Sequence, residues 1–326
     1  MAGWGLPYQG SKGAHAGKIY RAISQRHPDS QLLWEPFTGG GAVGAYFATH
    51  GWDVEASDAE RYVVALLREA TINSPLRDPV KSARIYRWVT REEFFAAVKR
   101  PESLGLPDWE IGFIRIFWSF GNSQTSYLYG KHLEPIKKAG TNLIVLQEPQ
   151  PFLNDIFPVS QQEKIAELPT VFARYRALQK AVRTLSGNKR RIEHVERLAS
   201  LDNINRVERL ASLDNINRVE RLASLRFHHR SYKQVFDDLL NMESPQVVYC
   251  DPPYASTAGY ASAGSFNSAE FWEAAQKLVS AGHHVYVSEY TAPEPWKPIL
   301  SFPRPENAGP KAKRNIAIER LFTMTK

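Results

Sequence analysis

The stretch LLWEPFTGGGAVGAYFATHG, at residues 32–51, decides the fold. It opens with an apolar run at 32–37, passes through a glycine turn and ends in a helical pattern that Gly51 can stop. DVEASD at 53–58 then predicts a second strand with an acid at its end. A series of strand, turn, helix and strand predicts a parallel α/β sheet.

The same pattern stops in the middle of the chain and resumes near its end. Apolar residues at helical spacing at 59–73 continue it, and QVVYCDPPY at 246–254 predicts a strand broken by two prolines. A helix at 271–282 and a buried strand at 283–290 follow. A short amphipathic helix is predicted at 18–26.

The interruption is rich in Arg, Lys and aromatic residues and has helical patterns on both sides of a polar-aromatic stretch at 118–131. We therefore predict a Rossmann-like sheet domain built from residues 1–80 and 226–326. An inserted, mainly helical region at 81–225 splits it.

A 12-residue repeat lies inside this insertion. VERLASLDNINR occurs at 195–206 and 207–218, and VERLASL starts a third copy at 219–225. Its apolar residues fall at every third position. On an α-helix this spacing distributes them around the whole helix and not along one face, whereas a 3₁₀-helix or a small solenoid would keep them on one side. The spacing leaves the structure of the repeat open. Exact copies are typical of tandem duplication, so we interpret the repeat as a surface insertion without a catalytic part; the alternative is an arm that contacts the partner.

Composition excludes several classes of protein. The 326 residues carry 41 Lys and Arg against 34 Asp and Glu, a net charge of +7, which is compatible with a polyanionic partner but does not establish one. Cys250 is the single cysteine, so an internal disulfide and a multi-cysteine metal site are excluded. The chain has no apolar run long enough for a membrane span and no secretory h-region at its start. We expect a soluble cytoplasmic protein that uses no metal and no membrane.

Basic residues gather in two segments where Gly or Pro predict loops, and such clusters are compatible with phosphate contacts. They are Arg183, Lys189, Arg190 and Arg191, and then Lys311, Lys313 and Arg314.

The glycine turn predicts a nucleoside site. Gly39, Gly41 and Gly44 form a literal GxGxxG between a strand and a helix, where backbone N–H groups can approach a ligand closely. Asp58, at the end of the next predicted strand, is suited to accept hydrogen bonds from ribose hydroxyls. NAD and S-adenosylmethionine both fit this pattern.

Asp251-Pro252-Pro253-Tyr254 forms a second motif, directly after an apolar strand. Two prolines must leave the sheet, so the acid and the ring are held at the carboxyl end of a strand, where α/β proteins place their sites. A carboxylate, a proline carbonyl and an aromatic ring together make a receptor for a planar base that bears an amino group.

With these motifs the sequence resembles the Dam-like D12 class of N6-adenine DNA methyltransferases. The resemblance rests on Pro7–Lys12, Glu35–Gly41, Ser57-Asp58 and Asp251–Tyr254, in that order. It extends to Val287–Tyr290 and Glu319–Phe322, and residues 118–131 look similar to phage-borne members.

The resemblance implies that the enzyme transfers a methyl group from S-adenosylmethionine to N6 of a flipped adenine in double-stranded DNA, and that 81–225 recognises the target. We expect a monomer, with a weak dimer as the alternative, encoded by a bacterium or a phage. The implied catalytic residues are Asp251, Pro252, Pro253 and Tyr254. The implied cofactor-binding residues are Tyr8, Gly10, Lys12, Glu35, Phe37, Gly39, Gly41, Asp58 and Asp251.

One position departs from the family pattern: Ser231 stands where family members often carry an acid, so a carboxylate contact to the cofactor's adenine is missing there. Three other functions remain as alternatives. They are a methyltransferase acting on RNA or on a protein glutamine, an NAD-dependent oxidoreductase, and a DNA-binding relative whose catalytic site has decayed.

Overall fold

The predicted strand, glycine turn and helix at 32–51 form β1 (Leu32–Glu35) and α2 (Ala42–Ala48) in the computed structural model. The structure describes residues 5–73, 78–185, 201, 225–253, 266–305 and 316–324. Gly41 precedes α2 with a left-handed φ of 75°, and Gly51 follows it with a φ of 86°. A glycine adopts this conformation without the steric cost of a Cβ atom, which explains why the helix begins and ends here.

Over the described residues, the sheet has seven strands in the order β3-β2-β1-β4-β5-β7-β6. The remaining strands are β2 (Asp53–Asp58), β3 (Leu225–His229), β4 (Val247–Cys250), β5 (His284–Glu289), β6 (Lys297–Pro305) and β7 (Ile316–Thr323). The first five strands of that order are parallel, and β7 runs antiparallel to both β5 and β6. The predicted Rossmann-like α/β sheet is therefore confirmed.

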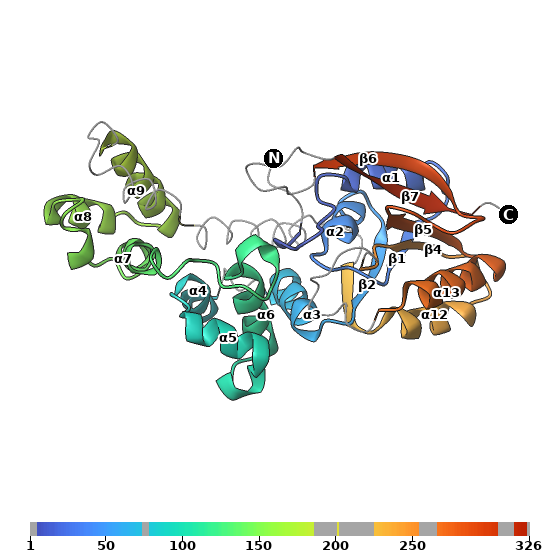
Figure 1. The fold of residues 1–326 in the computed structure, drawn as a ribbon, viewed down its shortest axis with the longest axis horizontal. Coiled ribbons are helices and arrows are strands. Elements are labelled where there is room, and N and C mark those ends of the chain that lie inside the picture. Colours follow the sequence, from blue (N-terminus) through green and yellow to red (C-terminus); the bar gives the residue numbers. More distant parts are fainter. Residues whose placement is uncertain are drawn as a thin grey trace. The chain divides into compact units, whose positions relative to one another are not determined.

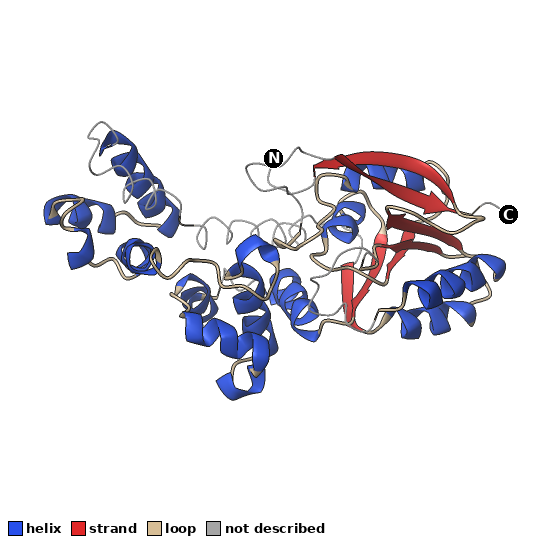
Figure 2. Cartoon of the chain, viewed as in Figure 1, coloured by secondary structure: helices blue, strands red, loops and turns tan. Residues whose placement is uncertain are grey.

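Helices cover the sheet on both sides (Figures 1 and 2). On one face, α12 (Tyr232–Leu240) and α13 (Ser268–Ser280) bury their apolar residues against Val248 and Cys250 of β4. The alternate residues Val247 and Tyr249 are buried as well, and they point to the opposite face because strand side chains alternate. A strand buried on both faces is typical of a parallel sheet with helices on each side. The other helices of this part are α1 (Ala16–Ser24) and α3 (Arg61–Arg68), followed by a π-helical turn at Glu69–Asn73.

The chain divides into two compact units, 1–73 with 212–326 and 74–211. The first contains the sheet, and the second is helical over its described residues. The helices of the second are α4 (Pro79–Tyr86), α5 (Arg91–Lys99), α6 (Asp108–Phe117), α7 (Glu134–Val145), α8 (Val159–Ala166) and α9 (Val171–Leu185). Short 3₁₀ turns lie at Pro101–Leu104, Phe120–Asn122 and Pro151–Leu153.

Several local predictions differ from the structure. The helix predicted at 59–73 is present as α3 and the π-helical turn that follows it, whereas three strands, β3, β6 and β7, were not predicted. Arg183 lies within α9 and not in a loop. Among the basic residues singled out with it, Lys189, Arg190, Arg191, Lys311, Lys313 and Arg314 lie outside the described residues.

The repeat at 195–225 also lies outside the described residues, apart from Leu201 and Leu225. Leu201 is buried in the core of α7, α8 and α9, and Leu225, the last residue of the third copy, begins β3. The conformation of the repeat stays open. Among the helices that the structure describes, none combines the length and apolar character of a membrane span.

Candidate active site

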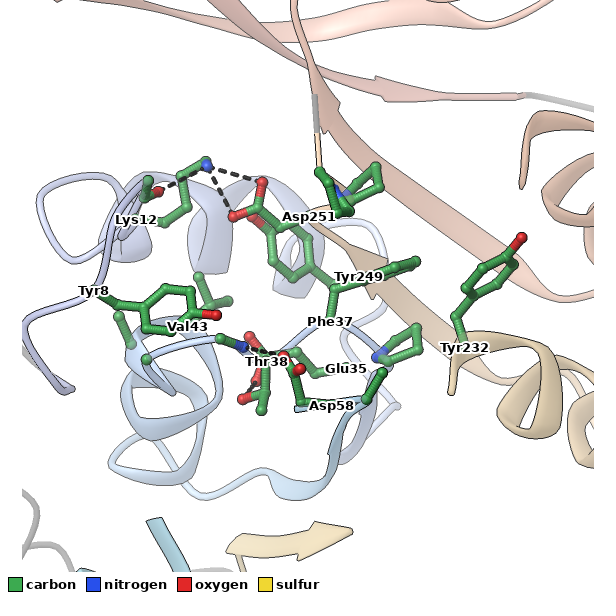
Figure 3. A pocket seen from close by; sticks show the side chains of 18 of the residues that line it. Tyr8, Lys12, Glu35, Phe37, Thr38, Val43, Asp58, Tyr232, Tyr249 and Asp251 are labelled. Carbon is green, nitrogen blue, oxygen red and sulfur yellow. Dashed lines mark hydrogen bonds and ion pairs between the residues drawn. The ribbon is translucent and has the colours of Figure 1, made fainter. Parts of the chain in front are cut away.

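A cavity of about 370 Å³ lies at the carboxyl ends of β1, β2 and β4 (Figure 3). The sheet order places β1 beside β4, and from this pair the chain builds outward in both directions. Such a switch point leaves a crevice at the carboxyl ends of the strands, where open α/β sheets bind ligands. The predicted residues that line the cavity are Tyr8, Gly10, Lys12, Glu35, Phe37, Gly39, Asp58, Asp251, Pro252 and Pro253.

The glycine turn forms the floor of the cavity beneath Tyr8. A Cβ atom on Gly39 would lie 3.0 Å from Cε1 of the Tyr8 ring, and one on Gly40 would lie 2.7 Å from the Tyr8 Cβ atom. The N–H of Leu6 donates to the Gly40 carbonyl at 2.8 Å, so the N-terminal segment is fastened to the turn. Because Gly39 and Gly40 have no side chains, the N-terminal segment can pack directly against the backbone of the turn.

Glu35 lies beneath the turn and is almost completely buried. Its Oε2 atom accepts hydrogen bonds from the Gly44 N–H and the Thr38 hydroxyl, each at 3.1 Å. Burial raises the pKa of this carboxyl well above its ordinary value. These contacts indicate that Glu35 orders the turn, and its predicted contact with a cofactor stays a prediction.

Asp58 links the end of β2 to the turn. Its Oδ2 atom accepts from the Gly39 N–H at 2.8 Å and its Oδ1 atom accepts from the Glu60 N–H at 2.9 Å. Burial raises the pKa of Asp58, whereas both backbone hydrogen bonds lower it. Each carboxylate oxygen keeps a second lone pair, so Asp58 can still accept a ligand hydroxyl.

Asp251 follows β4 and is held by Lys12. The Lys12 ammonium lies 2.8 Å from both Oδ atoms of Asp251, and Figure 3 shows it above the carboxylate. The same ammonium donates to the Gly10 carbonyl at 3.1 Å and lies 3.1 Å from Oε1 of Glu319 in β7. Lys12 is thus placed to orient Asp251, although the sequence predicted only a contact with the cofactor.

Aromatic residues form another side of the cavity. Phe37 stacks on Tyr232 with ring centroids 5.2 Å apart, and Phe266 meets Phe37 edge-on at 6.0 Å. The Ser231 hydroxyl accepts from the Gln234 N–H and so caps α12, while the Gln234 side chain accepts from the Ser231 N–H. The hydroxyl and the N–H of Ser231 are therefore both hydrogen-bonded at the start of α12, in the arrangement called a capping box.

Some predicted residues lie elsewhere. Gly41 is not among the residues that line the cavity, and its N–H closes the turn on the Thr38 carbonyl at 2.8 Å. Tyr254 lies outside the described residues.

Four residues of this region, Tyr249, Ser288, Glu289 and Glu319, had no predicted role. The Tyr249 hydroxyl pairs with Ser288 at 2.9 Å below the cavity, and Glu289 ends β5 close to the charge of Asp251. Burial, followed by the charges of Asp251 and Glu319, raises the pKa of Glu289 to about 7. Glu289 could have been noticed as an acid at the end of the strand predicted at 283–290, since such residues are rarely buried without a partner, whereas Glu319 lies in a strand that was not predicted.

The Asp251 region therefore combines two carboxylates, Asp251 and Glu319, with the Lys12 ammonium, and Glu289, whose raised pKa favours its protonated form, lies close to them. An excess of negative charge in a low-dielectric cavity favours a cationic ligand or a developing positive charge. Within the described residues, no group of His, Cys, Asp or Glu side chains is arranged to hold a metal ion.

Comparison with known proteins identifies the family. A family model described as D12 class N6 adenine-specific DNA methyltransferase matches residues 8–169 and 175–293. No curated protein matches. Among solved structures, the rRNA methyltransferase aviRa from Streptomyces viridochromogenes is 14% identical over 98% of this chain and 86% of that chain, with a TM-score of 0.30, too low to support an argument. The family match spans most of the chain, so the protein belongs to the D12 class N6 adenine-specific DNA methyltransferases.

Proposed function

We propose that this adenine-specific DNA methyltransferase takes its methyl group from S-adenosylmethionine and delivers it to an adenine flipped out of double-stranded DNA. The observation that carries the proposal is that one cavity joins the glycine turn, Asp58 and Asp251. A nucleoside site and an acceptor for an amino group are thereby combined in one place.

The residues of the cavity fit S-adenosylmethionine. Its volume of about 370 Å³ lies in the range of small-molecule pockets. Asp58 offers free lone pairs for ribose hydroxyls, the rings of Phe37 and Tyr232 offer apolar surface for a purine, and the carboxylates near Asp251 suit a sulfonium. The bound cofactor would supply a methyl group that the sulfonium has already activated.

Asp251 would prepare the target nitrogen. The lone pair of an adenine amino group is delocalised into the ring, which makes N6 a poor nucleophile. If Asp251 and the Pro252 carbonyl both accept hydrogen bonds from this amino group, the nitrogen shifts toward tetrahedral geometry and its lone pair becomes available. Such positioning and the nearby negative charge favour the positive charge that develops on nitrogen.

Access to the cavity requires base flipping. An adenine within a duplex cannot bring N6 to a carboxylate that lies inside a protein cavity, so the nucleotide must rotate out of the stack at a cost of a few kcal/mol. We assign the stacking contact with the flipped base to Tyr254. Target recognition is assigned to 81–225 and catalysis to 1–80 and 226–326, and the net charge of +7 supports binding to DNA phosphates.

Incorporation of tritiated methyl groups from labelled S-adenosylmethionine tests the proposal. We expect incorporation into unmethylated duplex DNA, in a product that is N6-methyladenine, and none into RNA or protein. Incorporation mainly into RNA or protein would overturn the choice of substrate. Cofactor binding without transfer to any of the three would instead indicate a decayed relative.

A further inference from the structure

The Lys12 ammonium is shared by two carboxylates that come from different strands. Asp251 follows β4 and Glu319 belongs to β7, and the distances from Nζ are 2.8 Å and 3.1 Å. Lys12 is 3% exposed and Glu319 is 0% exposed, whereas the side chain of Asp251 is 21% exposed. The ammonium therefore lies between a carboxylate that a substrate can reach and one that it cannot.

We propose that Glu319 is a positioning residue for methyl transfer, which holds the Lys12 ammonium against both oxygens of Asp251 and so fixes the orientation of that carboxylate toward the target amino group. The proposal rests on the proposed function, because it takes Asp251 as the acceptor of the N6 hydrogen bond.

Glu319 can act only through its neighbours. It is completely buried and is not among the residues that line the cavity, so neither cofactor nor substrate touches it. Its position is fixed by β7, which pairs with β5 on one side and β6 on the other. The strand next to β5 is β4, which leads directly into Asp251. The carboxylate of Glu319 is thus a fixed point on the same sheet that carries Asp251.

The donors of Lys12 explain why a second carboxylate matters. An ammonium has three N–H donors, and here hydrogen bonds go to the two oxygens of Asp251 and the Gly10 carbonyl, while Glu319 adds a second negative charge 3.1 Å from Nζ. The pair of contacts with Asp251 fixes the plane of its carboxylate and leaves a second lone pair on each oxygen for the amino group. Without Glu319 the buried positive charge would draw more on Asp251, which would make Asp251 a weaker acceptor and leave Lys12 less well placed.

The test is a double-mutant cycle with Glu319→Gln and Lys12→Met, measured as the single-turnover rate of methyl transfer at saturating cofactor and DNA. We expect Glu319→Gln to lower this rate about 10²-fold, the scale of a small misplacement of a reacting group, while its cofactor affinity stays near that of the wild type. In the Lys12→Met background, the same substitution should change the rate by less than roughly threefold, because coupled residues are not additive.

Glu55→Gln is the matched control, since Glu55 is a strand carboxylate of the same unit, bonded to His228 at 2.7 Å outside the cavity. It should keep the wild-type rate. If Glu319→Gln does not fold, Glu319→Asp is the second variant. It keeps the negative charge, but its side chain is one methylene shorter and places the carboxylate farther from Lys12, so the rate should fall about tenfold.

Two results would overturn the inference. One is a wild-type rate in the folded Glu319 variant, and the other is that Glu319→Gln lowers the rate by the same factor in the Lys12→Met background as in the wild type. An active Asp251→Ala variant would instead refute the proposed function, so the two failures are distinguishable.

Discussion

The N-terminal segment should bind the cofactor only as long as Gly40 carries no side chain. A methyl group added by Gly40→Ala would lie 2.7 Å from the Tyr8 Cβ atom and 3.0 Å from the Leu6 carbonyl oxygen. Non-bonded carbon atoms prefer about 3.5–4.0 Å, so the segment that carries Tyr8 and Lys12 must move by roughly 1 Å. The φ angle of Gly40 is not left-handed, so this collision is the main cost of the substitution.

The collision determines how much free energy the Gly40→Ala substitution costs. Overpacking of this kind typically costs about 1–3 kcal/mol. If cofactor binding requires the native position of the segment, the same energy is lost from the affinity, which becomes roughly 5–150-fold weaker at 1.4 kcal/mol per tenfold. Isothermal titration of the variant with S-adenosylmethionine measures the affinity, and thermal unfolding without ligand measures the stability.

Gly51→Ala serves as the control. Gly51 has a φ of 86° and no atom within 4 Å of an added Cβ, so alanine there introduces backbone strain of about 1–2 kcal/mol without touching the segment. This variant should lose stability but keep the wild-type affinity. Wild-type affinity in a folded Gly40→Ala variant would refute the reasoning, because the segment 5–12 would then have no part in the cofactor site.

Two further predictions concern the acids of the site. Asp58→Asn should destabilise the protein by about 1–3 kcal/mol and weaken cofactor binding, because an amide NH₂ would then face one of the N–H groups of Gly39 and Glu60. Denaturant unfolding measures the stability and titration with S-adenosylmethionine measures the affinity. If both stay at the wild-type values, the prediction is wrong. Glu289 has a pKa raised from 4.5 to about 7, so the folded state holds its proton more tightly and the stability falls as the pH rises through this window. Glu289→Gln should therefore gain up to about 3 kcal/mol relative to the wild type above pH 7, with no such gain near pH 4, and a pH-independent difference in unfolding free energy would exclude the effect.

The centre of the fold could be predicted because its signals are local. The strand predicted at 53–58 is β2 with the same bounds, since the glycines before it and the acid at its end mark the pattern clearly. β6 was missed because its nine residues contain Pro298, Pro303 and Pro305, which argue against a strand. The sheet order explains the exception: β6 is an edge strand, where a missing N–H donor is tolerated.

The site could be predicted in part for the same reason. The glycine turn, Asp58 and Asp251 stand in recognisable motifs, and the structure brings them to one cavity. The ion pair between Lys12 and Asp251 joins residues 239 positions apart, and no periodicity encodes such a contact. Glu319 shows the same limit, because the partner of a buried charge is set by the packing of the sheet and not by its neighbours in sequence.

Asp251 provides the most direct test of the central claim that this carboxylate activates the target amino group. The measurement compares methyl transfer to duplex DNA by the wild type and by Asp251→Ala, with cofactor affinity determined on the same samples. The account predicts that transfer is abolished while S-adenosylmethionine still binds, because Asp58 and the glycine turn are unchanged. Turnover by Asp251→Ala at the wild-type rate would contradict the account.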